Sequence, residues 1–122
     1  MNNWRAGGVD VGDIVRIDDG EFEHRLGYGW ARGRLKHGDL LLAVHHGGDC
    51  FYDYILLDHT EMTLEGVTML RVNPIPVPFG AYTLGRNIGR VDFEQLRRLQ
   101  AGESLSIAMP ETYATPELSA IA

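Results

Sequence analysis

The sequence lacks several features that would place it in a special class of protein. It has one cysteine, Cys50, so it cannot form an internal disulfide, and we expect a reducing compartment. Its longest apolar run, Leu40–Val44, is far shorter than the roughly 20 residues needed to cross a bilayer. The segment after Met1 also lacks the apolar stretch of a secretory signal. These absences predict a cytoplasmic protein without a membrane partner.

Lysine is scarce, and the two signs of charge are separated along the chain. The net charge is −6, and Lys36 is the one lysine among 11 basic residues. Residues 24–38 hold four basic residues and no acid, residues 39–66 hold six acids and no Lys or Arg, and residues 67–91 hold three arginines and no acid. An acidic protein can therefore still present local basic surface to an anionic ligand.

The composition predicts one globular unit. The chain has 122 residues, of which 44% are hydrophobic and 23% charged, as in an ordinary soluble domain. We expect a single mainly-β domain over residues 1–110, followed by a C-terminal tail over residues 111–122.

Strands are the main predicted elements. The nearly continuous apolar run Leu40–His46 is typical of a strand covered on both faces, and Gly47-Gly48-Asp49 predicts a turn into an antiparallel strand over Cys50–Leu57. Further strands are expected over residues 12–17, 63–72 and 105–109, with a bent strand or hairpin over residues 26–36.

The segment Asn73–Phe79 carries three prolines at alternate positions. In an extended chain Pro74, Pro76 and Pro78 would leave one side without N–H donors. The segment is therefore predicted to join a sheet through one edge and to refuse a strand at the other. A polyproline II recognition strip is the alternative.

One helix is predicted, over residues 92–101. Asp92 and Gln95 have the spacing of a capping box, and Gly102 would end the helix. Several strands, abundant glycine and this late helix predict an α+β fold that is mainly antiparallel β. We expect a curved sheet or a small, partly open barrel of SH3-like type with one C-terminal helix.

The leading functional hypothesis rests on an Arg/aromatic face. Alternation along the predicted strand puts aromatic rings, which can stack on bases, on the same face as cations, which can bind phosphates. Two further arginines in Gly85–Arg90 could complete a pocket, although a plain connecting loop and arginines paired with acids are the simpler alternatives. The predicted ligand-binding residues are Tyr28, Trp30, Arg32, Arg34, Lys36, Arg86 and Arg90. This hypothesis describes a small non-enzymatic protein that binds a nucleotide or single-stranded nucleic acid.

The alternative hypothesis rests on the acidic block, residues 39–66. Such strands could dock a basic protein partner, as expected of a regulator or inhibitor of the phage or mobile-element anti-defence type. Solvated acids at alternate strand positions are the simpler explanation. The partner-binding residues predicted here are Asp49, Tyr52, Asp53, Tyr54 and Asp58.

Metal binding and catalysis are weaker hypotheses. Residues 45–61 contain imidazole, thiol and carboxylate groups, but their spacing matches no zinc ribbon or finger. A nucleophilic Cys50 would need a base such as His45 or His59 within hydrogen-bond reach. We therefore expect no metal and no cofactor, and an enzyme ranks third after the two binding hypotheses. Exposed sheet edges could support a homodimer anchored by Trp4.

The leading hypothesis predicts salt-dependent binding of nucleotides or short single-stranded oligonucleotides. The double substitution Arg32→Ala/Arg34→Ala should weaken this binding, because it removes two phosphate-binding groups. Fluorescence anisotropy on a panel of labelled oligonucleotides checks the prediction. Equal binding by wild type and variant, or none by the wild type, would remove the hypothesis.

Overall fold

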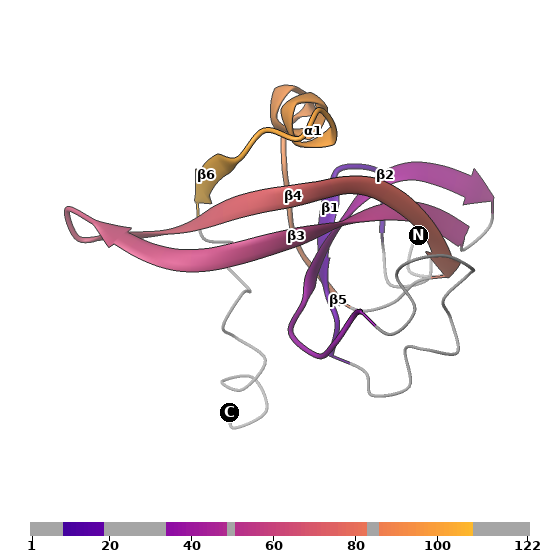
Figure 1. The fold of residues 1–122 in the computed structure, drawn as a ribbon, viewed down its shortest axis with the longest axis horizontal. Helices are drawn as coiled ribbons and strands as arrows, with labels where there is room; N and C mark the ends of the chain where they lie inside the picture. Colours follow the sequence, from indigo (N-terminus) through magenta and orange to yellow (C-terminus); the bar gives the residue numbers. More distant parts are fainter. Residues whose placement is uncertain (1–8, 19–33, 49–50, 83–85, 109–122) are drawn as a thin grey trace, which may run out of the picture.

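The strands form one antiparallel sheet in the computed structural model, which describes residues 9–18, 34–48, 51–82 and 86–108 (Figure 1). The six strands among these residues are arranged in the order β5-β1-β2-β3-β4-β6. The sheet curls into a half-barrel, which confirms the predicted mainly antiparallel α+β fold. The elements are β1 (Asp13–Arg16), β2 (Leu40–Gly48), β3 (Phe51–Leu64), β4 (Val67–Tyr82), β5 (Arg86–Arg90), α1 (Phe93–Gln100) and β6 (Leu105–Ala108).

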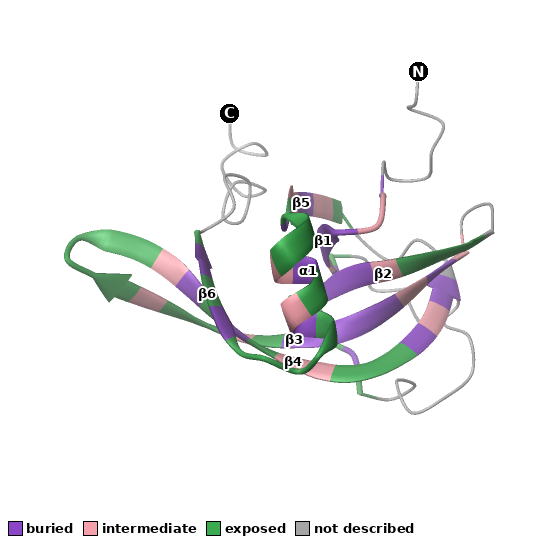
Figure 2. Ribbon diagram, turned by 90° about the horizontal axis from the view of Figure 1, so that it is seen from above, coloured by how far each residue is buried: buried purple, intermediate pink, exposed green. Residues whose placement is uncertain are grey.

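Strand β2 is buried on both faces, as its continuous apolar sequence predicted. Leu40, Leu41, Leu42 and Ala43 are all fully inaccessible to solvent. Successive side chains of a strand point to opposite faces, so this one strand contributes to two hydrophobic clusters. Figure 2 shows its centre buried beneath the helix.

The two clusters lie on opposite faces of the sheet. On one face, α1 packs through Leu96 and Leu99 onto β2, β3 and β4. On the other face, the curl of the sheet closes over the second cluster, which is made of Val9, Val15, Ile17, Leu35, Leu41, Ala43, Tyr52, Tyr54, Leu56, Phe79 and Ala81.

The helix begins as its sequence predicted. The Asp92 carboxylate accepts the backbone N–H of Gln95 at 2.7 Å, and the Gln95 side-chain oxygen accepts the N–H of Asp92 at 3.0 Å. This confirms the capping box, and Gly102, with a φ of 93°, follows the helix end. Among the described residues, no helix is long and apolar enough to span a membrane.

Two sequence predictions need correction. The strand expected over residues 63–72 is interrupted by a turn at Glu65 and Gly66, whose φ angles are 53° and 83°. Positive φ at both positions is typical of the type I′ hairpin turn. The sequence did not indicate this turn because asparagine or aspartate usually occupies the first position, where this chain has Glu65. The loop expected over residues 85–90 is instead mostly strand β5, paired with β1.

The proline segment forms part of β4 and lies at an edge. Strand β6 pairs with β4 over Met69–Val72, ahead of the first proline, and no other described strand pairs with that edge. The regular alternation is not kept, because residues 76–78 bulge opposite Ile55, between the pairs Leu56↔Ile75 and Tyr54↔Phe79. The segment thus joins the sheet through β3, as predicted, with a bulge in place of regular pleating, and the refusal of a strand at its other edge stays a prediction.

Phe51 covers Gly80 on the neighbouring strand. A Cβ atom placed at Gly80 would lie 2.5 Å from Cζ of Phe51, well inside van der Waals contact. Gly80 is therefore required for the position of the ring, and its backbone φ lies outside the positive range that excludes other residues.

We predict that Gly80→Ala destabilises the fold by about 1–3 kcal/mol, because the new methyl group displaces the Phe51 ring. In a Phe51→Ala background the same substitution should cost less than about 0.5 kcal/mol. Urea unfolding of the four proteins in this double-mutant cycle measures the difference. An equal cost of Gly80→Ala in both backgrounds would contradict the prediction.

Candidate functional site

Four of the residues predicted to bind an anion lie in the described part of the chain, and three of these, Lys36, Arg86 and Arg90, are ion-paired with carboxylates. Tyr28, Trp30 and Arg32 lie outside the part of the chain that the structure describes. Arg34 is exposed just before β2. The Lys36 ammonium lies 3.0 Å from the Asp39 carboxylate, which also accepts the backbone N–H of Lys36 at 2.9 Å.

The two arginines of β5 are each matched to carboxylates from the start of the chain. Arg86 Nη2 lies 3.1 Å from Asp18 Oδ2, and Arg90 Nε lies 3.0 Å from Asp13 Oδ1. A second carboxylate, that of Asp10, is 3.5 Å from Arg90 Nη2. Both guanidinium groups therefore tie β5 to β1 and its flanks, and nearby acids neutralise their charge.

Asp13 is the centre of this polar contact. Its carboxylate is buried, and it accepts the backbone N–H of Asp10 at 2.7 Å and the side-chain amide of Asn87 at 2.7 Å, in addition to Arg90. Burial raises the pKa of the Asp13 carboxyl above its ordinary value, although these donors and Arg90 oppose the shift. Because donors of the same chain engage both oxygens, the group anchors β5 and is not placed to act on a substrate.

The residues of the alternative hypothesis are divided between core and surface. The rings of Tyr52 and Tyr54 are buried, and the Tyr52 hydroxyl donates to the Val9 carbonyl at 2.7 Å, so both tyrosines serve the core. Asp53 Oδ2 lies 3.5 Å from Nδ1 of His45. Asp58 is exposed on β3, and Asp49 lies outside the described residues.

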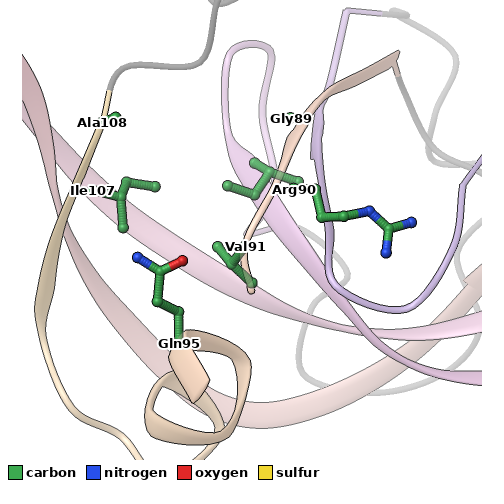
Figure 3. A pocket seen from close by; sticks show the side chains of 7 residues that line it. Gly89, Arg90, Val91, Gln95, Ile107 and Ala108 are labelled. Atoms are coloured by element: carbon green, nitrogen blue, oxygen red, sulfur yellow. The ribbon is translucent and has the colours of Figure 1, made fainter. Parts of the chain in front are cut away.

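The described residues offer no metal site, and the cleft that the structure shows among them has one charged residue, Arg90, in its lining. Among the described residues, no group of three or more His, Cys, Asp or Glu side chains is arranged to hold a metal. A small cleft of about 240 Å³ lies between α1, β5 and β6 (Figure 3). Figure 3 shows the Arg90 guanidinium directed away from Gln95 and Ile107 on its walls, consistent with the ion pair to Asp13.

The most distinctive exposed feature is the hairpin that β3 and β4 form beyond the rest of the sheet (Figure 1). Pairing between β2 and β3 ends at Leu40↔Leu57, whereas β3 continues to Leu64 and pairs with β4 as far as Val67. We call this projection, residues 58–73, the arm. Gly66 is the one residue in the sequence that favours this turn, and Glu65 before it is atypical of a type I′ turn.

The pairing register of the arm gathers four apolar side chains on one face. Residues directly opposite each other in an antiparallel pair point to the same side, and residues two apart along a strand share that side. Leu64 is paired with Val67, and Met62 is paired with Met69. Leu64 and Val67 are each 58% exposed, and Figure 2 shows the exposed end of the arm. We call these four residues the apolar tip.

Acidic side chains lie on both faces and at the turn of the arm. Asp58, Glu61 and Glu65 are all exposed on β3 and its turn. The basic residue of the arm, Arg71, donates to the Ser106 hydroxyl at 3.3 Å across the β4–β6 pair. The arm therefore combines exposed apolar surface with negative charge.

The Asp13 contact predicts a stability effect. Asp13→Asn replaces one acceptor oxygen with an NH₂ group that faces other donors, and it should lower the free energy of unfolding by about 1–3 kcal/mol near neutral pH. Urea unfolding of wild type and variant measures this loss.

The same variant tests the sign of the pKa shift. Because burial raises the folded pKa of Asp13 above its ordinary value of 3.8, the folded state binds this proton more tightly than the unfolded state. The advantage of wild type over Asp13→Asn should therefore be largest in acid and shrink as the pH rises through the folded pKa. An advantage that grows with pH would mean that Arg90 and the donors outweigh burial.

Comparisons of the chain with protein-family models, with curated proteins and with solved structures gave no match, so the basis for a functional inference is the arm and its apolar tip.

Proposed function

We propose that this protein is a protein-binding regulator or inhibitor that uses its arm to dock a partner with a basic and apolar surface. The observation that carries the proposal is the apolar tip, in which Leu64 and Val67 remain more than half exposed on a hairpin that projects from the body. Apolar side chains grouped at an exposed site, with polar residues around them, are a common mark of protein-interaction surfaces.

The apolar tip could supply the attractive part of the binding energy. Complete burial of a Leu or Val side chain contributes about 1.5–3 kcal/mol relative to full exposure, so burying the exposed halves of Leu64 and Val67 would contribute on the order of 1 kcal/mol each. Met62 and Met69 are already half-buried and add an adaptable surface beside them.

The acidic residues define the chemistry of the partner. Residues 39–66 contain no Lys or Arg, and Asp58, Glu61 and Glu65 lie in this segment. Their negative charge would steer a basic protein toward the arm and discourage an acidic one. We therefore retain the hypothesis of a basic protein partner. Because Tyr52 and Tyr54 are buried, we propose the arm as the contact surface in their place.

Binding of an anionic ligand by the Arg/aromatic face stays a prediction. Lys36, Arg86 and Arg90 are already matched to carboxylates, which makes them less available to a phosphate. The oligonucleotide measurement with Arg32→Ala/Arg34→Ala decides that hypothesis separately from the arm.

We predict that binding of the partner depends on the apolar tip. Wild-type protein used as bait in a lysate of its own cells should capture a basic protein that the double variant Leu64→Asp/Val67→Asp loses. Mass spectrometry identifies the captured protein, and titration of the purified pair should show at least a tenfold weaker affinity for the variant, because two apolar contacts are replaced by charge.

Phe93→Asp is the matched control. Phe93 is 78% exposed on α1, so the substitution also replaces an exposed apolar side chain with an acid, but away from the arm. It should leave binding unchanged. The proposal fails if wild type and the arm variant capture the same proteins, or if Phe93→Asp reduces binding as much as the arm variant does.

A further inference from the structure

We infer that the partner docks a helix on the face of the arm that carries the apolar tip, and that Arg71 and Asp58 fix the register of this helix. Within the basic and apolar surface proposed above, the helix presents apolar side chains, one acid and one base, in that order along the arm. The inference rests on the proposed function, because it names the element of the partner that the arm recognises.

The face of the apolar tip continues from the turn toward the body of the molecule. Thr60 is paired with Arg71, and Asp58 is paired with Asn73, so all four lie on the same side of the arm as the apolar tip. All four are exposed. From the turn inward, this face carries two apolar rows, then a row with the cation Arg71, then a row with the anion Asp58. We call it the tip face.

The helix of this chain covers the opposite side of the sheet. The neighbours of the tip-face residues on β4, Leu70 and Val72, point to the other side and are buried in the cluster that contains Leu96 and Leu99 of α1 (Figure 1). Among the described residues, no helix covers the tip face. Sheets are covered by helices or by other sheets, and this sheet already accepts a helix on its other side.

Arg71 retains donors for a carboxylate of the partner. Its Nη1 donates to the Ser106 hydroxyl at 3.3 Å, and no carboxylate among the described residues forms an ion pair with it. A guanidinium group carries five N–H donors, so this one hydrogen bond leaves others to a partner. By contrast, Lys36, Arg86 and Arg90 are each paired with a carboxylate. An acid of the partner can therefore bind at Arg71.

Asp58 and Arg71 together give the tip face a direction. The two are diagonal neighbours, because Arg71 is paired with Thr60 and Asp58 precedes Thr60 by two positions, and no ion pair joins these two described side chains. A helix with an acid against Arg71 and a base against Asp58 binds in one register, and the same helix shifted by one row meets like charge. Glu61 points to the other face and takes no part in this contact.

The spacing of the rows suits a helix that lies along the arm. Residues two apart on a strand are separated by about 7 Å, whereas residues four apart on a helix rise by about 6 Å. Apolar residues at positions i and i+4 of the helix would therefore cover the two apolar rows. An acid at i+8 and a base at i+12 would then reach Arg71 and Asp58, because the accumulated mismatch of about 2 Å is within the reach of long side chains.

Two libraries of displayed helical peptides test this inference with the full-length protein. Both carry leucine at i and i+4, but the first has glutamate at i+8 and lysine at i+12, and the second has these two residues exchanged. The other positions vary identically, and each order is encoded in both chain directions, so the two libraries have the same composition. Selection on wild type from an equal mixture should enrich the first library at least fivefold over the second.

Exchange of the two charges on the arm provides the second part of the test. Asp58→Arg/Arg71→Asp should enrich the second library at least fivefold over the first, because both charges of the tip face are reversed while the net charge is unchanged. Glu94→Arg/Arg97→Glu exchanges an exposed ion pair on α1 and should keep the preference of wild type. Circular dichroism verifies that both variants are folded.

The outcomes separate this inference from the proposed function. If wild type enriches both libraries equally, or if the exchanged arm keeps the wild-type preference, the register assigned to Arg71 and Asp58 is wrong. If neither library is enriched while capture of a partner still depends on Leu64 and Val67, helix docking is wrong and the arm remains a docking surface. If neither enrichment nor dependence on the apolar tip is found, both are wrong.

Discussion

The structure depends on the pairing of β2 with β3, because these two strands contribute to both hydrophobic clusters. Leu40–Ala43 and Tyr54–Leu57 are buried on both faces of the sheet, so each face must be covered. The helix covers one face, and the curl of the sheet covers the other. Burial of apolar surface is the main favourable term in folding, and here it is concentrated where all the central strands overlap.

The arm follows from a mismatch in strand length. Strand β2 has 9 residues, whereas β3 has 14 and β4 has 16, so the outer strands of the hairpin continue past the strand that organises the core. Toward the turn of the arm, the β2–β3 pairing ends at Leu57 and the β4–β6 pairing ends at Met69. The apolar tip is therefore exposed because its neighbours end earlier. Such a projection costs stability unless another molecule covers it, which is why we place function there.

The sequence predicted those features that depend on local patterns. The apolar run of β2, the capping box at Asp92 and the prolines of β4 each act through backbone geometry or burial, which a short segment specifies by itself. Contacts between distant segments could not be predicted in the same way. The pairing of Arg90 with Asp13 needs the β1–β5 register, and the burial of Tyr52 needs Val9 to meet its hydroxyl across the fold. The apolar tip was missed for a different reason. Glutamate is atypical at the first position of such a turn, so the sequence around Glu65 did not indicate the hairpin.

The distribution of charge links the fold to the proposed recognition. Six of the described basic residues form ion pairs with carboxylates: Arg16, Lys36, Arg86, Arg90, Arg97 and Arg98. These pairs neutralise acids around the body of the molecule, while Asp58, Glu61 and Glu65 lie in a segment that contains no Lys or Arg. The negative charge of the arm is thus set by segregation along the chain and not by the total of −6.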